Sequence, residues 1–169
     1  MIHKRAVLIG VGVCVLGFDQ LGKSQAMGRL AEGERVRLLG EFLSLAHVES
    51  SGAALGLFRS WSAESQSMVF GFLSLVCAAM VLFFYRGLAR GEHGSAAALG
   101  AILAGVFSNA IDRFRFGAGI DFLHLGAPDS AWLPDFNLAD VSIVLGVVTL
   151  IVELLATEMA TRAQEKPRS

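Results

Sequence analysis

The sequence predicts an all-α membrane protein, with four transmembrane helices and a small β-containing periplasmic element and loop after the first helix. Of its 169 residues, 54% are hydrophobic and only 17% are charged, and the mean hydropathy is +0.59. Soluble domains carry about 25% charged residues. The apolar residues also gather in segments close to the roughly 20 residues that a spanning helix needs. With 14 basic and 15 acidic residues the chain offers nucleic acid no attraction, and two cysteines exclude a disulfide-rich scaffold.

We expect one four-helix domain over residues 1–162, followed by a cytoplasmic tail over 163–169. The first helix is expected at about 6–28, where an apolar run meets Asp19 and then continues. Because basic residues precede this run, a cleavable signal peptide is the alternative. The run lacks an A-x-A-type cleavage site, and Val-Gly-Val before Cys14 is a poor lipid-attachment sequence. These features favour a helix that is retained.

The other three helices are expected at about 67–85, 95–112 and 138–160. The second is a continuous apolar run, and the third is rich in alanine and glycine. The fourth has Asp140 almost at its start and Glu153 inside it. Acidic groups at bilayer depth are costly, so each is a functional hypothesis by default. The sequence gives no explanation for Glu153.

The basic residues predict the orientation of the helices. Seven lysines and arginines lie in about 25 residues at the termini and in the loop between helices two and three, against seven in about 75 residues of the other loops. This density places both termini in the cytoplasm and the loops 31–66 and 112–137 on the outer face. Residues 36–48 alternate loosely between apolar and polar, which favours short strands at the interface.

Two acids at the outer ends of the expected helices stand out. Asp121 has apolar neighbours in GIDFL, and Asp140 lies on the first turn of the fourth helix, where Asn137 or Asp135 could provide the cap instead. Two carboxylates in one site cannot both ionise easily, so the pair holds a proton near neutrality. One member can then activate water while the other protonates a leaving amine. Spacing alone makes this pairing a weak signal.

Four motifs, in the order in which they occur along the chain, resemble those of a known family. They are DQLGK at 19–23, SSGAAL at 50–55, SNAIDRFRFGAGIDF at 108–122 and FNLAD at 136–140. Over roughly residues 6–157 the chain resembles lipoprotein signal peptidase (signal peptidase II), the inner-membrane aspartic protease that trims prolipoproteins. That family reads approximately D-Q-x-T-K, N-T-G-A-A-F, G-N-x-x-D-R-x-x-x-G-x-V-x-D-F and F-N-x-A-D. The last two motifs are long and specific.

The resemblance implies that Asp121 and Asp140 are the catalytic acids. It also implies a substrate-binding or supporting role for eight further residues: Asp19, Lys23, Ser50, Gly52, Asn109, Asp112, Arg113 and Asn137. Two of these assignments have structural alternatives. Asp112 and Arg113 could form an interfacial ion pair that ends a helix. Asp19 and Lys23 are an i,i+4 pair, for which a structural anchor is favoured over a chemical role.

The chain departs from the family pattern at several positions. Gly22 stands where the family has threonine, Ser50 and Ser51 replace Asn-Thr, and Leu55 replaces phenylalanine. Serine at position 50 loses the paired donor and acceptor of an amide, which weakens a contact to the substrate or to the acid pair. Ser108 and Ile120 replace a glycine and a valine. Both catalytic acids are kept, so we expect activity. A housekeeping enzyme and a specialised second copy both remain open.

The resemblance implies an endopeptidase that cuts a diacylglyceryl-modified prolipoprotein on the amino side of its lipidated cysteine. We expect contact with membrane lipid, no nucleic-acid partner, no metal, no cofactor and a monomer, although the small residues of the third helix are compatible with a dimer as well. Two alternatives remain open. One is a relative that binds lipopeptides without cutting them, and the other is a small transporter or channel that uses its membrane carboxylates.

Overall fold

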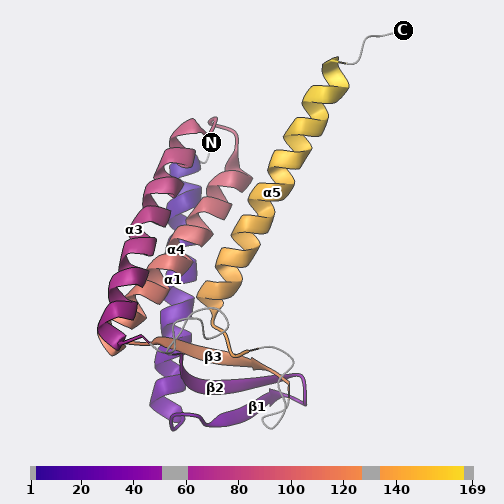
Figure 1. Cartoon of the computed structure of the whole chain (residues 1–169). Coiled ribbons are helices and arrows are strands. Elements are labelled where there is room, and N and C mark those ends of the chain that lie inside the picture. The colour runs from indigo at the N-terminus through magenta and orange to yellow at the C-terminus, as the bar shows by residue number, and fades with distance from the viewer. Residues whose placement is uncertain (1–2, 51–60, 127–133, 166–169) are drawn as a thin grey trace.

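The computed structural model describes residues 3–50, 61–126 and 134–165. Within these residues, four helices are long and apolar enough to cross a membrane. They are α1 (Lys4–Arg29), α3 (Ala63–Gly87), α4 (His93–Phe116) and α5 (Leu138–Glu165), and Figure 1 shows them beside a small sheet. The predicted class, four spanning helices with a small β element, is confirmed. Gly52 and Leu55 of the second motif lie outside the described residues.

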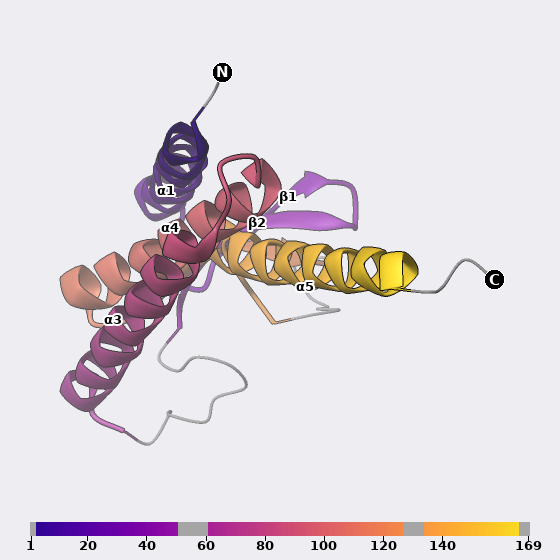
Figure 2. The same cartoon turned by 90° about the horizontal axis from the view of Figure 1, so that it is seen from above.

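Helix α4 lies at the centre of the bundle, in contact with α1, α3 and α5 (Figure 2). Two of its glycines explain how closely its neighbours approach. A methyl group at Gly100 would lie 2.5 Å from the carbonyl oxygen of Leu8 on α1, and one at Gly105 would lie 2.6 Å from that of Ala139 on α5. Small residues allow this backbone proximity between membrane helices. The alanine- and glycine-rich segment is therefore the packing core of the bundle.

The outer helices present large apolar side chains to their surroundings. On α3, Phe72, Leu75 and Phe83 are each at least 65% exposed. Helix α5 exposes Leu154 and Met159 in the same way. A soluble protein of this size rarely exposes so much contiguous apolar surface, whereas lipid tails make it favourable. The chain is thus a multi-pass membrane protein.

A three-stranded antiparallel sheet forms from the described parts of the segments 31–66 and 112–137. Strand β1 (Arg35–Leu39) pairs with β2 (Leu43–Ser50), and β2 pairs with β3 (Gly119–Leu125). The strands expected within 36–48 are therefore present. The third strand differs from the expectation, which has a loop throughout 112–137. Its first part is helical instead, since α4 continues to Phe116 and ends at Gly117 in the left-handed conformation, φ 77°.

The sheet lies at one end of the bundle, and the first turn of α1 and the last turns of α5 lie at the other (Figure 1). This second end explains Glu153, which accepts a hydrogen bond from Ser95 of α4. Gly94 leaves room for the Glu153 carboxylate. Lys4 donates to the backbone carbonyl of Leu88, at the end of α3. Both charged side chains thus have polar partners away from the sheet.

Candidate active site

Asn137 forms the N-terminal cap of α5. Its side-chain Oδ1 accepts a hydrogen bond from the backbone N–H of Asp140 at 2.9 Å, and Asp140 Oδ2 accepts from the backbone N–H of Asn137 at 3.2 Å. This reciprocal arrangement is that of a capping box, in which two orphan N–H groups of the first turn are satisfied at once. The carboxylate of Asp140 is thereby held at the start of the helix, at the sheet end of the bundle.

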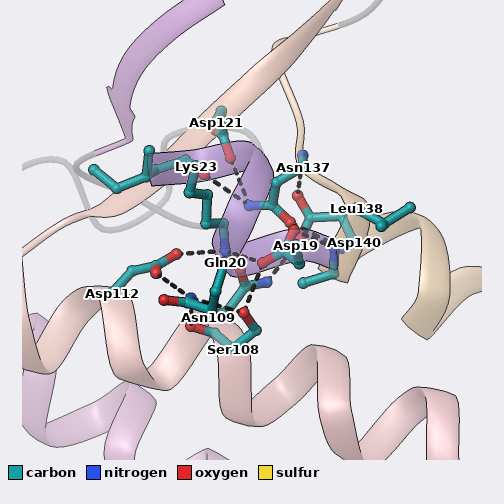
Figure 3. Close-up of polar contacts among 12 residues, drawn as sticks. Asp19, Gln20, Lys23, Ser108, Asn109, Asp112, Asp121, Asn137, Leu138 and Asp140 are labelled. Carbon is teal, nitrogen blue, oxygen red and sulfur yellow. Dashed lines mark hydrogen bonds and ion pairs between the residues drawn. The ribbon is translucent and has the colours of Figure 1, made fainter. Parts of the chain in front are cut away.

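The same asparagine reaches β3. Its Nδ2 donates to Asp121 Oδ1 at 2.8 Å and to the backbone carbonyl of Ile120 at 3.2 Å. Next to it, Phe136 and Leu123 exchange two backbone hydrogen bonds, which pair Phe136 with β3 in an isolated antiparallel β-bridge. Asp121 and Asp140 therefore lie on either side of Asn137, as Figure 3 shows. The sequence separated these acids by 19 positions, and the structure joins them through one side chain.

Asp140 has a second asparagine partner on α4. Asn109 Nδ2 donates to Asp140 Oδ1 at 2.8 Å. Asn109 Oδ1 accepts in turn from Lys23 Nζ of α1 at 3.1 Å. Two side-chain amides thus orient the acid pair, one from the helix cap and one from the central helix.

A buried ionic cluster of Asp19, Lys23 and Asp112 lies beside the acid pair (Figure 3). The Lys23 ammonium is 2.5 Å from an oxygen of each carboxylate, and none of the three side chains is more than 1% exposed. The other oxygen of Asp19 accepts from the backbone N–H of Ala139 at 2.8 Å. Because that N–H belongs to the first turn of α5, the cluster fixes the start of the helix that carries Asp140.

These contacts give the partners of the four motif residues that have structural alternatives. Asp19 and Lys23 form the i,i+4 pair that their spacing predicts. Asp112 pairs with Lys23, so the suggested helix-ending ion pair with Arg113 is not the arrangement of its carboxylate. Arg113 donates to the backbone carbonyl of Asn109 at 3.2 Å, and its guanidinium lies 4.1 Å from the centre of the Phe70 ring.

Burial and charge set the electrostatics of Asp121. Burial of its carboxyl group, followed by repulsion from Asp140, raises its pKa to about 7. The hydrogen bond from Asn137 and the positive charges of Lys23 and Arg113 oppose this rise. Because two neighbouring carboxyl groups cannot both ionise easily, the pair consequently carries a proton near neutral pH.

Comparison with known proteins decides the family. The model of a family described as signal peptidase (SPase) II matches residues 11–156. This chain belongs to the signal peptidase II family. A lipoprotein signal peptidase of Desulforapulum autotrophicum is 34% identical over 145 residues, covering 86% of this chain and 89% of that protein. One of Moorella thermoacetica is 35% identical over 145 residues, covering 86% and 90%.

Solved structures agree with this assignment. A bacterial membrane enzyme solved by the in meso method at 2.3 Å resolution superposes with a TM-score of 0.80 and 25% identity, over 96% of this chain and 94% of that one. A second, at 1.9 Å resolution, gives a TM-score of 0.76 and 26% identity, over 88% and 92%. Membership of the signal peptidase II family makes this membrane protein a peptidase.

The motif residue Ser50 lies in the sheet, at the end of β2, where it pairs with Gly119 of β3. Two partners, Ser108 and Gln20, have no role assigned from the sequence. Ser108 donates to Asp19 Oδ2 at 2.6 Å, and Gln20 donates to Ser108 Oγ and to Asp112 Oδ1, both at 2.8 Å. The only signal for Ser108 was its departure from the family glycine. Within the described residues, no group of three or more His, Cys, Asp and Glu side chains is arranged to hold a metal.

Proposed function

We propose that this chain is an aspartic endopeptidase that removes the signal peptide from prolipoproteins, on the amino side of a diacylglyceryl-modified cysteine. The observation that carries the proposal is the bridge of Asn137 between Asp121 and Asp140. The family supplies the substrate class, because its relatives are named lipoprotein signal peptidases. The bridged acids supply a means of hydrolysis that requires no nucleophilic side chain.

In this mechanism the two acids have opposite roles. Asn109 and the backbone N–H of Asn137 donate to the two oxygens of Asp140 and hold its carboxyl group in place. Asp140 takes a proton from water as the water oxygen attacks the scissile carbonyl carbon. Asp121, which holds a proton up to about pH 7, gives it to the leaving amine as the C–N bond breaks. The proton on Asp140 then returns the pair to its starting state.

The position of the pair suits a lipidated substrate. Asp140 lies at the first turn of a spanning helix, so acyl chains on the substrate cysteine can stay in the bilayer while the peptide reaches the acids. Leu38, Leu39 and Phe42 of the β1–β2 hairpin are more than half exposed, which supports contact of the sheet with lipid. We place this site at the outer face of the bacterial cytoplasmic membrane, with both termini in the cytoplasm.

The arrangement of charge argues against the two alternatives. A transporter or channel needs ionisable groups along the bilayer depth. Here Asp19, Lys23 and Asp112 gather with the acid pair at the sheet end, and both carboxylates are ion-paired with the one lysine. A binding protein that does not cut its ligand would not need a proton-holding pair, and both acids are present.

One assay separates the three functions. The purified protein in detergent is incubated with a diacylglyceryl-modified prolipoprotein, and the products are measured by mass spectrometry. We expect two products, the free signal peptide and a lipoprotein that begins with the modified cysteine. The matched control is the same prolipoprotein without the lipid, which we expect to be cut far more slowly. Binding without a mass change, or cleavage elsewhere in the chain, would contradict the proposal.

A further inference from the structure

A polar cluster that is separate from the motif residues lies beside the bridge between Leu123 and Phe136. His124 Nδ1 is 2.6 Å from Asp135 Oδ1, and Arg35 Nη2 of β1 donates to Asp135 Oδ2 at 2.7 Å. His124 is 2% exposed and Asp135 is 13% exposed, so this contact is largely shielded from water. We call Arg35, His124 and Asp135 the sheet clasp.

The sheet clasp occupies a defined register position. Leu123 and Phe136 form a hydrogen-bonded pair, so His124 and Asp135 are the next pair outward along the same two strands. Directly opposite residues of antiparallel strands have their side chains close together. Arg35 reaches Asp135 from β1, the strand at the opposite edge of the sheet. One carboxylate therefore ties both edges of the sheet to the segment that leads into α5.

The electrostatics agree with a stable ionic contact. Burial of Asp135 acts to raise its pKa, but the hydrogen bonds and positive charges of Arg35 and His124 outweigh burial and hold that pKa below its ordinary value. Asp135 is thus held as a carboxylate between two donors. Water screens partly buried charges less than exposed ones. The strength of this ionic contact therefore depends closely on its geometry.

We propose that the sheet clasp positions the acid pair by fixing the register of residues 135–137 against β3. Asn137 follows Asp135 by two residues and carries the hydrogen bonds to both Asp121 and Asp140. A shift of this segment would move Asn137 relative to β3 and open the bridge between the acids. Arg35, His124 and Asp135 are positioning residues, and they do not touch the reacting atoms. This inference rests on the proposed function for its catalytic consequence.

The test compares His124→Leu, which removes the donor, with His124→Asn, whose amide nitrogen stands near the place of Nδ1. In the prolipoprotein assay, His124→Leu is expected to lower kcat by about tenfold to a hundredfold with KM changed less than about twofold, since small misplacements of catalytic groups cost this much. His124→Asn should recover part of the loss. Arg162→Gln, which breaks the exposed pair with Glu158, is the matched control and should leave kcat unchanged.

Hydrogen exchange supplies a readout that does not depend on the reaction. In His124→Leu, the amides of Leu123 and Phe136 should exchange at least about tenfold faster than in the unmodified protein, while the helical amides of α4 stay unchanged. Unchanged exchange at these two amides would overturn the inference even if the enzyme cuts its substrate. Faster exchange with no cleavage by the unmodified protein would keep the clasp and overturn the proposed function instead. A loss of kcat shared equally by the Arg162→Gln control would also overturn the inference.

Discussion

Asn137 Nδ2 donates a 2.8 Å hydrogen bond to Asp121 Oδ1, while the Oδ1 of the same amide accepts from the backbone N–H of Asp140. The amide therefore uses its donor toward one acid and its acceptor toward the helix turn that carries the other. Because an amide has both functions in a fixed plane, neither a carboxylate nor an aliphatic side chain can replace it. The residue that connects the two acids, Asn137, is thus a neutral amide.

Replacing this amide should separate the acids. We expect Asn137→Ala to lower kcat by about tenfold to a hundredfold, because small misplacements of catalytic groups cost this much. The α5 cap is lost as well, so a fall in thermal stability should accompany it. Asn137→Ser is the control for the cap, since serine caps helices but cannot reach both acids. Full activity in either variant would contradict the bridging role.

The raised pKa of Asp121 predicts a pH-dependent stability difference. In the folded protein this carboxyl stays protonated to about pH 7, whereas in the unfolded chain it ionises near its ordinary value of 3.8. Ionisation of the unfolded chain thus reduces stability progressively between these two values, and the loss is constant above them. Asp121→Asn lacks this loss. The thermal unfolding midpoint of Asp121→Asn in detergent, minus that of the unmodified protein, should therefore increase as the pH rises through this window.

The control for this measurement is the pH itself. Below about pH 3, Asp121 is mostly protonated in both the folded and the unfolded chain, and the two proteins should differ least. A midpoint difference that stays the same from acid to neutral pH would show that Asp121 titrates normally in the fold, contrary to the burial and repulsion described above.

The buried cluster should be more sensitive to losing its cation than to losing all of its charges. Lys23→Met leaves Asp19 and Asp112 buried without a counter-charge, which we expect to destabilise the protein by about 3–5 kcal/mol. The triple variant Asp19→Asn, Lys23→Met, Asp112→Asn removes every charge together. The thermal unfolding midpoint of the triple variant in detergent should be higher than that of Lys23→Met. The reverse order would argue that the cluster is not held by ion pairing.

The departure at Gly22 has a structural counterpart on β3. A methyl group at Gly22 would lie 2.5 Å from Cζ of the Phe122 ring, so this phenylalanine packs against the bare backbone of α1. Gly22→Ala should push the ring away and disturb the neighbouring Asp121, with a lower kcat. Adding Phe122→Leu, which shortens the side chain, should restore part of the rate. If Gly22→Ala alone has normal kcat, the contact does not position Asp121.

Much of this architecture was accessible from the sequence, because apolar runs and small residues report directly on spanning helices and their packing. The motifs also brought Asp121 and Asp140 to attention before any geometry was known. The third strand was missed, since its residues GIDFLHL are nearly all buried and show no alternation. The sheet clasp was missed for a different reason. Arg35 is 100 positions from Asp135, and only the pairing of strands brings it to Asp135 and His124.

The role of Ser108 illustrates the same limit. A serine in an alanine- and glycine-rich helix predicts only close packing. Its hydroxyl donates to Asp19, 89 positions earlier, at the buried oxygen that also pairs with Lys23. Contacts of this kind follow from helix packing angles, which the one-dimensional pattern does not contain.

The most direct measurement is cleavage of a diacylglyceryl-modified prolipoprotein by Asp121→Asn and Asp140→Asn, each purified from membranes at the level of the unmodified protein. Asparagine keeps the shape of each side chain but can neither accept the proton of water nor donate one to the leaving amine. We expect both variants to accumulate and to unfold cooperatively, and neither to release signal peptide at a measurable rate. Processing at the normal rate by either variant would contradict the assignment of these two acids as the catalytic pair.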